Sequence, residues 1–144
     1  MSKILVDTNV LVYAIDKDSK FYFRSRQLLF ESNFKLFTTS KNLIEFLTVV
    51  TRGKEIPLPV EKAMSVVKDF CRVFTILYPT KGSFAIFEEL LEKYRPTGLK
   101  IHDYEIISIG LVSGINQIAT FNSKDFEDIE EVHIEKFIDG LQNY

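Results

Sequence analysis

The amino-acid sequence predicts an α/β protein built on a parallel sheet. Short runs of aliphatic and β-branched residues alternate with longer segments whose apolar residues recur at helical spacing. Such alternation is typical of a parallel sheet covered by helices on both faces. The chain has 144 residues, 46% of them hydrophobic, which suits one domain with a real core. Because no repeat or linker interrupts the pattern, we expect residues 1–144 to form a single domain.

The first half of the chain is expected to contain two strands and three helices. In chain order these are strand Ile4–Val6, helix Asn9–Ile15, helix Phe21–Ser32, strand Leu36–Thr38 and helix Lys41–Thr51. Both strands are short apolar runs of the kind found in buried sheets. Thr8 or Asn9 is expected to cap the first helix and Ser40 the third, because their side-chain oxygens can accept from free backbone N–H groups. Gly53 is expected to follow the end of the third helix.

The second half continues the alternation. The expected elements are a helix that begins near Pro59 and carries Ala63, Val66, Val67 and Phe70, strand Val73–Leu77, helix Phe84–Tyr94, helix Asp103–Ser113, strand Gln117–Thr120, and a last strand Val132–Glu135 before a terminal helix. Phe84, Phe87, Leu90 and Leu91 recur at helical spacing and predict a packed face. Gly114 is expected to end its helix, and Asn122–Phe126 reads as a polar loop.

Composition excludes several classes of protein. The net charge of −2 gives no strong overall attraction for nucleic acid, although a local basic rim or a bound metal can supply one. Cys71 is the only cysteine, so an intrachain disulfide and a cysteine zinc site are excluded; we expect its thiol to be buried. Since the sequence has neither a secretory apolar segment nor a membrane-spanning run, we expect a cytoplasmic protein.

Four acidic residues stand at the ends of predicted elements. Asp7 follows the first strand, Glu45 lies early in helix Lys41–Thr51, Asp103 begins a helix, and Asp125 lies just past a strand. In a parallel sheet the carboxyl ends of the strands and the starts of the following helices share one edge. We therefore expect Asp7, Asp103 and Asp125 to converge there, with Glu45 reaching in from a neighbouring helix.

Converging carboxylates need a compensating positive charge, because several within about 4–6 Å cannot all stay ionised. Oxygen ligands of this kind suit Mg²⁺ or Mn²⁺. An ion held by few carboxylates keeps water ligands, so it can activate a water and stabilise charge during phosphoryl displacement. This chemistry is that of a metal-dependent nuclease.

Four segments together resemble the PIN domain, and most closely the VapC-type ribonuclease toxins of bacterial toxin–antitoxin pairs. They are Asp7-Thr8-Asn9, Asn42–Arg52 with its central Glu45, Asp103 at a helix start, and Thr120–Phe126. The resemblance covers nearly the whole chain. It implies a PIN-like α/β/α sandwich with a central parallel sheet of four to five strands, and metal-dependent endoribonuclease activity.

The resemblance also assigns roles to individual residues. Asp7, Glu45 and Asp103 match the acidic triad that binds Mg²⁺ or Mn²⁺. Many members have an acid where this chain has Asn122, and others use the position of Asp125, so either residue can complete the catalytic set and the number of ions stays open. Among the polar residues, three match positions around the acids: Thr8 and Thr120 match hydroxyls that line the site, and Asn9 matches a position that holds the neighbouring acids.

The partners implied by the resemblance are an RNA substrate, a cognate antitoxin and a second copy of the chain in a homodimer. A housekeeping RNA-processing nuclease and a PIN-fold binding module with weakened catalysis remain alternatives. A phosphoacceptor receiver or an aspartate-nucleophile phosphatase fits poorly, since Asn9 stands where the phosphatase needs a second Asp. His102 is expected to be a solvated histidine. The aromatic and basic segment Phe21–Arg26 can contact RNA, pack inward or bind the antitoxin.

Overall fold

A central sheet of five parallel strands organises the computed structural model, which describes residues 1–52 and 57–135. The strands are β1 (Lys3–Val6), β2 (Lys35–Thr39), β3 (Thr75–Leu77), β4 (Gln117–Ala119) and β5 (His133–Ile134). Their order across the sheet is β3-β2-β1-β4-β5, and every neighbouring pair is parallel. The predicted sheet of four to five parallel strands is confirmed.

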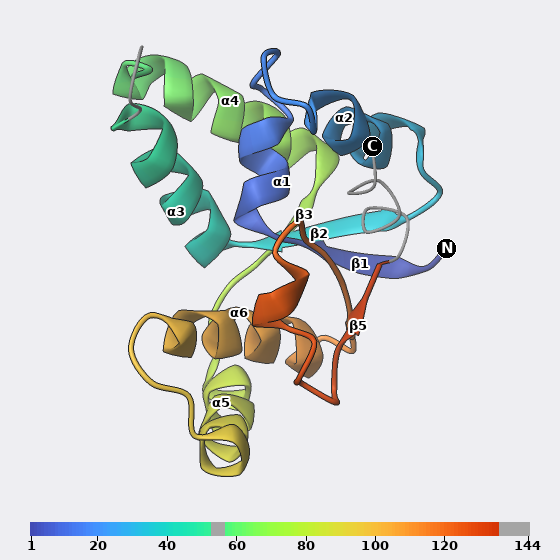
Figure 1. Ribbon diagram of the computed structural model, residues 1–144, viewed down its shortest axis with the longest axis vertical. Helices are drawn as coiled ribbons and strands as arrows, with labels where there is room; N and C mark the ends of the chain where they lie inside the picture. The colour runs from blue at the N-terminus through green and yellow to red at the C-terminus, as the bar shows by residue number, and fades with distance from the viewer. Residues whose placement is uncertain (53–56, 136–144) are drawn as a thin grey trace.

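Helices cover both faces of the sheet (Figure 1). They are α1 (Thr8–Tyr13), α2 (Tyr22–Glu31), α3 (Ser40–Thr51), α4 (Val60–Val73), α5 (Lys81–Tyr94) and α6 (Lys100–Val112), with a short 3₁₀ turn, η1 (Ser123–Asp125). Helices α1 to α4 lie on one side of the sheet, and α5 and α6 lie on the other. The predicted α/β/α sandwich is therefore confirmed. Within the described ranges, no helix has the length and apolar character needed to cross a membrane.

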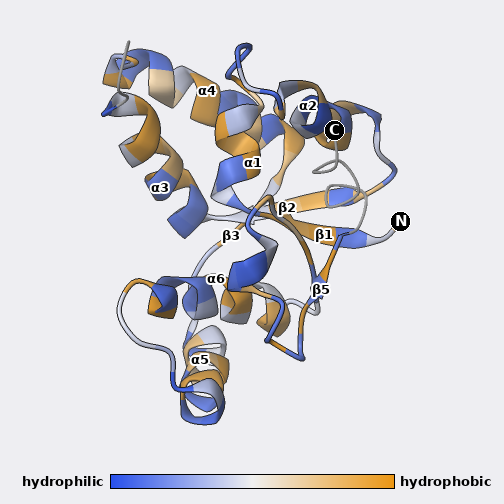
Figure 2. Ribbon diagram, in the orientation of Figure 1, coloured by the Kyte–Doolittle hydropathy of each residue, from blue (hydrophilic) through white to orange (hydrophobic). Residues whose placement is uncertain are grey.

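Two hydrophobic cores form because side chains alternate along each strand. In β1, Ile4 and Val6 are fully buried among α1 to α4, whereas Leu5 is buried in the second core with residues of α5 and α6. Figure 2 shows the corresponding apolar colouring of β1 and β2 between the two helical layers. Burying one such side chain stabilises the fold by about 1.5–3 kcal/mol.

Helix α6 lies unusually deep for an amphipathic helix, with six of its residues buried. A methyl group added at Gly110 would lie 3.2 Å from Leu5 Cδ2, so the glycine allows the helix to approach β1 closely. Asp103 lies in the first turn of this helix.

The strand order places a topological switch point between β1 and β4. After β1 the chain builds β2 and β3 on one side, then crosses to the other side to form β4 and β5. Ligands of open α/β sheets bind outside the carboxyl ends of the strands at such a point. Asp7 directly follows β1, and Thr120 directly follows β4.

Several predicted helix starts are corrected by the capping geometry. Asp7 itself caps α1 by accepting from the Thr8 N–H, so neither Thr8 nor Asn9 is the cap. Thr39, not Ser40, caps α3 through a reciprocal capping box.

The helix predicted to begin at Phe84 begins at Lys81, because Thr80 forms a second capping box. The phenylalanine is 58% exposed, so its predicted place on a packed face is wrong.

Two further predictions concern α4 and the strand that follows it. Cys71 is exposed, which contradicts the expected buried thiol: α4 turns Ala63, Val67 and Phe70 inward and leaves the cysteine on another face. Val73 ends α4 instead of beginning β3. The predicted roles of Gly53 and of the terminal helix fall outside the described residues.

Candidate active site

Asp7 and Thr120 meet because of the register between β1 and β4. Val6 pairs with Ala119, and the Asp7 N–H donates to the Ala119 carbonyl at 2.9 Å. The next residues along the two strands are therefore side by side, and Thr120 Oγ1 donates to Asp7 Oδ2 at 2.8 Å. A contact across 113 residues of sequence thus follows directly from the sheet.

Asn9 ties α1 to the loop that follows β4. Its Nδ2 donates to Thr120 Oγ1 at 3.2 Å, and its Oδ1 accepts from the Phe121 N–H at 3.2 Å. The Asn122 N–H also donates to Thr120 Oγ1, at 3.0 Å. The Thr120 hydroxyl is thereby oriented by two donors towards its own acceptor, Asp7.

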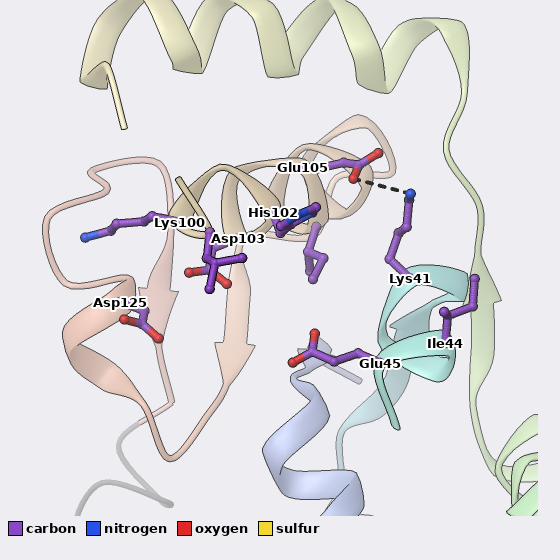
Figure 3. A pocket seen from close by; sticks show the side chains of 10 residues that line it. Lys41, Ile44, Glu45, Lys100, His102, Asp103, Glu105 and Asp125 are labelled. Atoms are coloured by element: carbon purple, nitrogen blue, oxygen red, sulfur yellow. Dashed lines mark ion pairs between the residues drawn. The ribbon is translucent and has the colours of Figure 1, made fainter. Parts of the chain in front are cut away.

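A cavity of about 570 Å³ opens beside this junction. It is lined by Lys41, Ile44, Glu45, Leu99, Lys100, His102, Asp103, Glu105, Ile106 and Asp125. Figure 3 shows the side chains of Glu45, Asp103 and Asp125 reaching the same space from α3, α6 and η1. Asp7 does not line the cavity, but it lies close enough for its charge to act on Asp103.

The carboxyl group of Asp103 is held partly protonated near neutral pH. Its pKa is raised from 3.8 to about 7, mostly by burial and then by the charges of Asp125, Asp7 and Glu45 in that order, while Lys100 acts in the opposite direction. Because all three other acids contribute, the four carboxyl groups form one electrostatic cluster.

Asp7 experiences opposing influences. Its net pKa is about 6, against an ordinary 3.8: burial raises it most, and the charges of Glu45 and Asp125 act in the same direction. The hydrogen bonds from the Thr120 hydroxyl and the Thr8 N–H lower it. Without these donors the carboxyl would hold its proton to a higher pH.

The donor chemistry of the cluster fits a hard divalent cation. Its ligands are carboxylate oxygens, which Mg²⁺ and Mn²⁺ prefer, and a cation would relieve the repulsion that raises the pKa values of Asp7 and Asp103. In the described part of the chain, however, no three His, Cys, Asp or Glu side chains are placed to hold an ion as they stand. Binding would therefore require the side chains to close around the ion.

The remaining predicted residues occupy distinct places. Thr8 is 4% exposed and contacts Asn42 instead of the cavity. Asp125 lines the cavity, whereas Asn122 is exposed and is not among the lining residues. His102 is exposed at the cavity rim.

Sequence reasoning missed two kinds of residue near the acids. Lys41 and Lys100 bring positive charge to the cavity, with Lys41 Nζ 3.6 Å from Glu105 Oε1. Asn42 is fully buried and donates from Nδ2 towards Asp7 Oδ1 at 3.4 Å. The pattern Thr39-x-x-Asn42 gave a capping signal that could have drawn attention to it.

Comparison with known proteins places the chain among characterised folds. The family model of the PIN domain matches residues 4–132. VapBC2 from Rickettsia felis, bound to a DNA fragment from its promoter, is similar at a TM-score of 0.69 and 25% identity, over 92% of this chain and 97% of that chain. Comparison with curated proteins finds no match.

Two further solved structures share the fold at lower identity. DNA-bound VapBC from Salmonella typhimurium has a TM-score of 0.67 and 24% identity, over 94% of this chain and 98% of that one. VapC20 from Mycobacterium tuberculosis, described as a sarcin-ricin loop cleaving toxin, has a TM-score of 0.69 and 14% identity, over 88% and 95%.

Proposed function

Because this chain belongs to the PIN domain family, we propose that it is a Mg²⁺- or Mn²⁺-dependent endoribonuclease that acts as the toxin of a type II toxin–antitoxin pair. The observation that carries this proposal is the gathering of Asp7, Glu45, Asp103 and Asp125 at the β1/β4 switch point. A cluster of carboxyl groups beside a cavity, in which Asp7 and Asp103 have raised pKa values, is typical of a site that works on a charged ligand.

In this proposal Asp7, Glu45 and Asp103 hold the divalent cation, and Asp125 completes the set. A bound cation supplies Lewis-acid stabilisation of the phosphoryl group and lowers the pKa of water. The chain itself orients Asp7 through the Thr120 hydroxyl and the Thr8 N–H.

Two lysine side chains at the cavity are suited to contact the phosphates of an RNA backbone. Lys41 and Lys100 line the cavity beside the acids, and phosphate contacts from lysine are the usual source of affinity for nucleic acid. They offset locally the negative charge of the carboxylates and the net charge of −2.

The proposed partners follow from the family and its neighbours. Several similar structures are VapBC toxin–antitoxin complexes, and the one from Rickettsia felis aligns along nearly the full length of both chains. We place the protein in the cytoplasm, as a homodimer that a cognate antitoxin holds inactive.

Cleavage of RNA by the purified chain tests the function. With Mg²⁺ or Mn²⁺ present we expect cleavage that chelation abolishes and that falls at least about 100-fold in Asp7→Asn and Asp103→Asn. Asp18→Asn is the matched control, since Asp18 is exposed in a loop before α2. Cleavage that is equal in all four proteins, or that persists in chelator, would refute the mechanism.

One observation favours a second candidate, a PIN-fold binding module without catalysis: among the described residues, no three His, Cys, Asp or Glu side chains are arranged to hold an ion as they stand. Calorimetric titration separates the two candidates. If the chain binds no Mn²⁺ even at about millimolar concentration, its affinity is below that of functional protein sites. This result would favour the binding module.

A further inference from the structure

Asn42 joins the two elements that carry Asp7 and Glu45. It lies in the first turn of α3 and is 0% exposed. Its Nδ2 donates to Thr8 Oγ1 at 3.0 Å and towards Asp7 Oδ1 at 3.4 Å. Glu45 is three residues further along the same helix, so both side chains project from the same side of α3.

The side-chain oxygen of Asn42 takes part in the capping box at the start of α3. Asn42 Oδ1 accepts from Thr39 Oγ1 at 2.7 Å and from the Thr39 N–H at 3.3 Å, and the Asn42 N–H donates to Thr39 Oγ1 at 3.1 Å. Every polar atom of the buried amide therefore has a partner, which fixes its orientation.

Capping alone does not require an amide at this position. Helix α5 has the same capping box with serine: Ser83 Oγ accepts from the Thr80 N–H at 2.8 Å, and the Ser83 N–H donates to Thr80 Oγ1 at 3.0 Å. The Ser83 hydroxyl donates back to the Thr80 carbonyl at 2.9 Å. The additional Nδ2 group of Asn42 is directed at Thr8 and Asp7 instead.

We propose that Asn42 is a positioning residue of the acid cluster, which holds Asp7 at a fixed place relative to Glu45. This inference rests on the proposed function, since it concerns the ability of the two acids to bind one cation. Groups that orient metal ligands typically change metal affinity by about 10–100-fold when they are removed.

Asn42→Ser tests the proposal, because it can keep the capping box in the form that α5 uses while it removes the amide group that donates to Thr8 and Asp7. We expect calorimetry with Mn²⁺ alone to show binding at least about tenfold weaker than in the wild-type chain. Urea unfolding of the metal-free protein reports whether the fold is retained.

A second pair of variants keeps the test decisive if Asn42→Ser does not fold. Thr39→Ala removes the hydroxyl that orients the Asn42 amide, and Thr80→Ala removes the equivalent hydroxyl in α5. We expect weaker Mn²⁺ binding in the first variant and wild-type binding in the second.

The outcomes separate this inference from the proposed function. Mn²⁺ affinity equal to that of the wild type in Asn42→Ser, or in Thr39→Ala where the serine variant does not fold, overturns the role of Asn42 alone. Equal weakening in Thr39→Ala and Thr80→Ala also overturns it, because the effect would then be one of helix capping. A wild-type chain that binds no Mn²⁺ overturns both proposals.

Discussion

Replacing Asp7 by asparagine is expected to stabilise the metal-free protein at neutral and higher pH. The carboxyl has a pKa of about 6 in the folded chain, against an ordinary value of 3.8. A group that binds its proton more tightly when folded makes the folded state less stable as pH rises from the lower value through the higher one. Above about pH 6 the folded wild-type chain therefore carries the full cost of an ionised Asp7.

The size of this effect follows from the two pKa values. Raising the pKa from 3.8 to about 6 corresponds to about 3 kcal/mol, of which about 2 kcal/mol develops between pH 4.5 and pH 8. This is a large fraction of the 5–15 kcal/mol that holds a typical domain folded. Altered hydrogen bonding of asparagine adds a constant difference at both pH values, so the change with pH isolates the charge.

Urea unfolding in the presence of a chelator measures the effect. The free energy of unfolding of Asp7→Asn, relative to the wild type, is expected to rise by about 2 kcal/mol from about pH 4.5 to about pH 8. Asp18→Asn, in an exposed loop, is expected to show no such change. A difference between Asp7→Asn and the wild type that stays constant, or that falls with pH, would refute the assignment of a buried and repelled carboxyl.

Four further expectations can be checked by calorimetry, NMR titration, urea unfolding and reaction with a thiol reagent. Mn²⁺ affinity should rise from about pH 5.5 to about pH 7.5 with release of protons, because Asp7 and Asp103, with pKa values of about 6 and about 7, must ionise to bind it; calorimetry showing a flat affinity contradicts this. Thr120→Val removes the donor to Asp7, so NMR titration should place the pKa of that carboxyl above about 6, and Mn²⁺ affinity by calorimetry should fall towards the upper end of about 10–100-fold. Tyr94→Phe removes a hydroxyl that makes two hydrogen bonds to the loop before β5; urea unfolding should show a loss of about 1–2 kcal/mol, with Mn²⁺ affinity unchanged. Cys71, being exposed, should react with a thiol reagent in the native protein nearly as fast as in urea, and protection until unfolding would restore the original prediction of a buried thiol.

The strands and their sheet were predictable because local preference and tertiary burial agree there. Ile4–Val6 is a short apolar run, and its residues are indeed buried on both faces of the sheet. The helix starts were less predictable, since adjacent residues are equally good caps. Thr39 caps α3 instead of Ser40 because β2 continues through Thr39, which leaves that residue with the extended backbone of a cap.

The local sequence also did not predict which residues of a helix are exposed and which are buried. Cys71 and Phe70 are neighbours in an apolar segment, and only the packing of α4 against the first core decides which of them turns inward. The phenylalanine does, and the cysteine faces outward.

The acid cluster was predictable from chain topology, whereas the support that Asn42 gives to it was not. Asp7 follows a strand, and Asp103 lies in the first turn of α6, which begins at Lys100 and not at Asp103 as predicted; their place at the sheet edge therefore depends mainly on the order of elements. The contact of Asn42 with Asp7 depends on how closely α3 approaches the end of β1, a distance that no sequence pattern encodes. The sequence did not decide whether Asp125 or Asn122 completes the site. In the structure Asp125, in η1, lines the cavity, and Asn122, at the start of that turn, is not among the lining residues.

The hydrogen bonds around Asp7 explain why a cation could compete for it at neutral pH. Burial favours the protonated form, and the Thr120 hydroxyl opposes burial most strongly among the hydrogen-bond donors. That donor lies 2.8 Å from the carboxylate, whereas Asn42 Nδ2 lies at 3.4 Å. Because hydrogen bonds weaken with distance, Thr120→Val should reduce Mn²⁺ affinity more than Asn42→Ser. The reverse order would mean that Asn42 acts through the placement of α3 and Glu45 more than through its bond to Asp7.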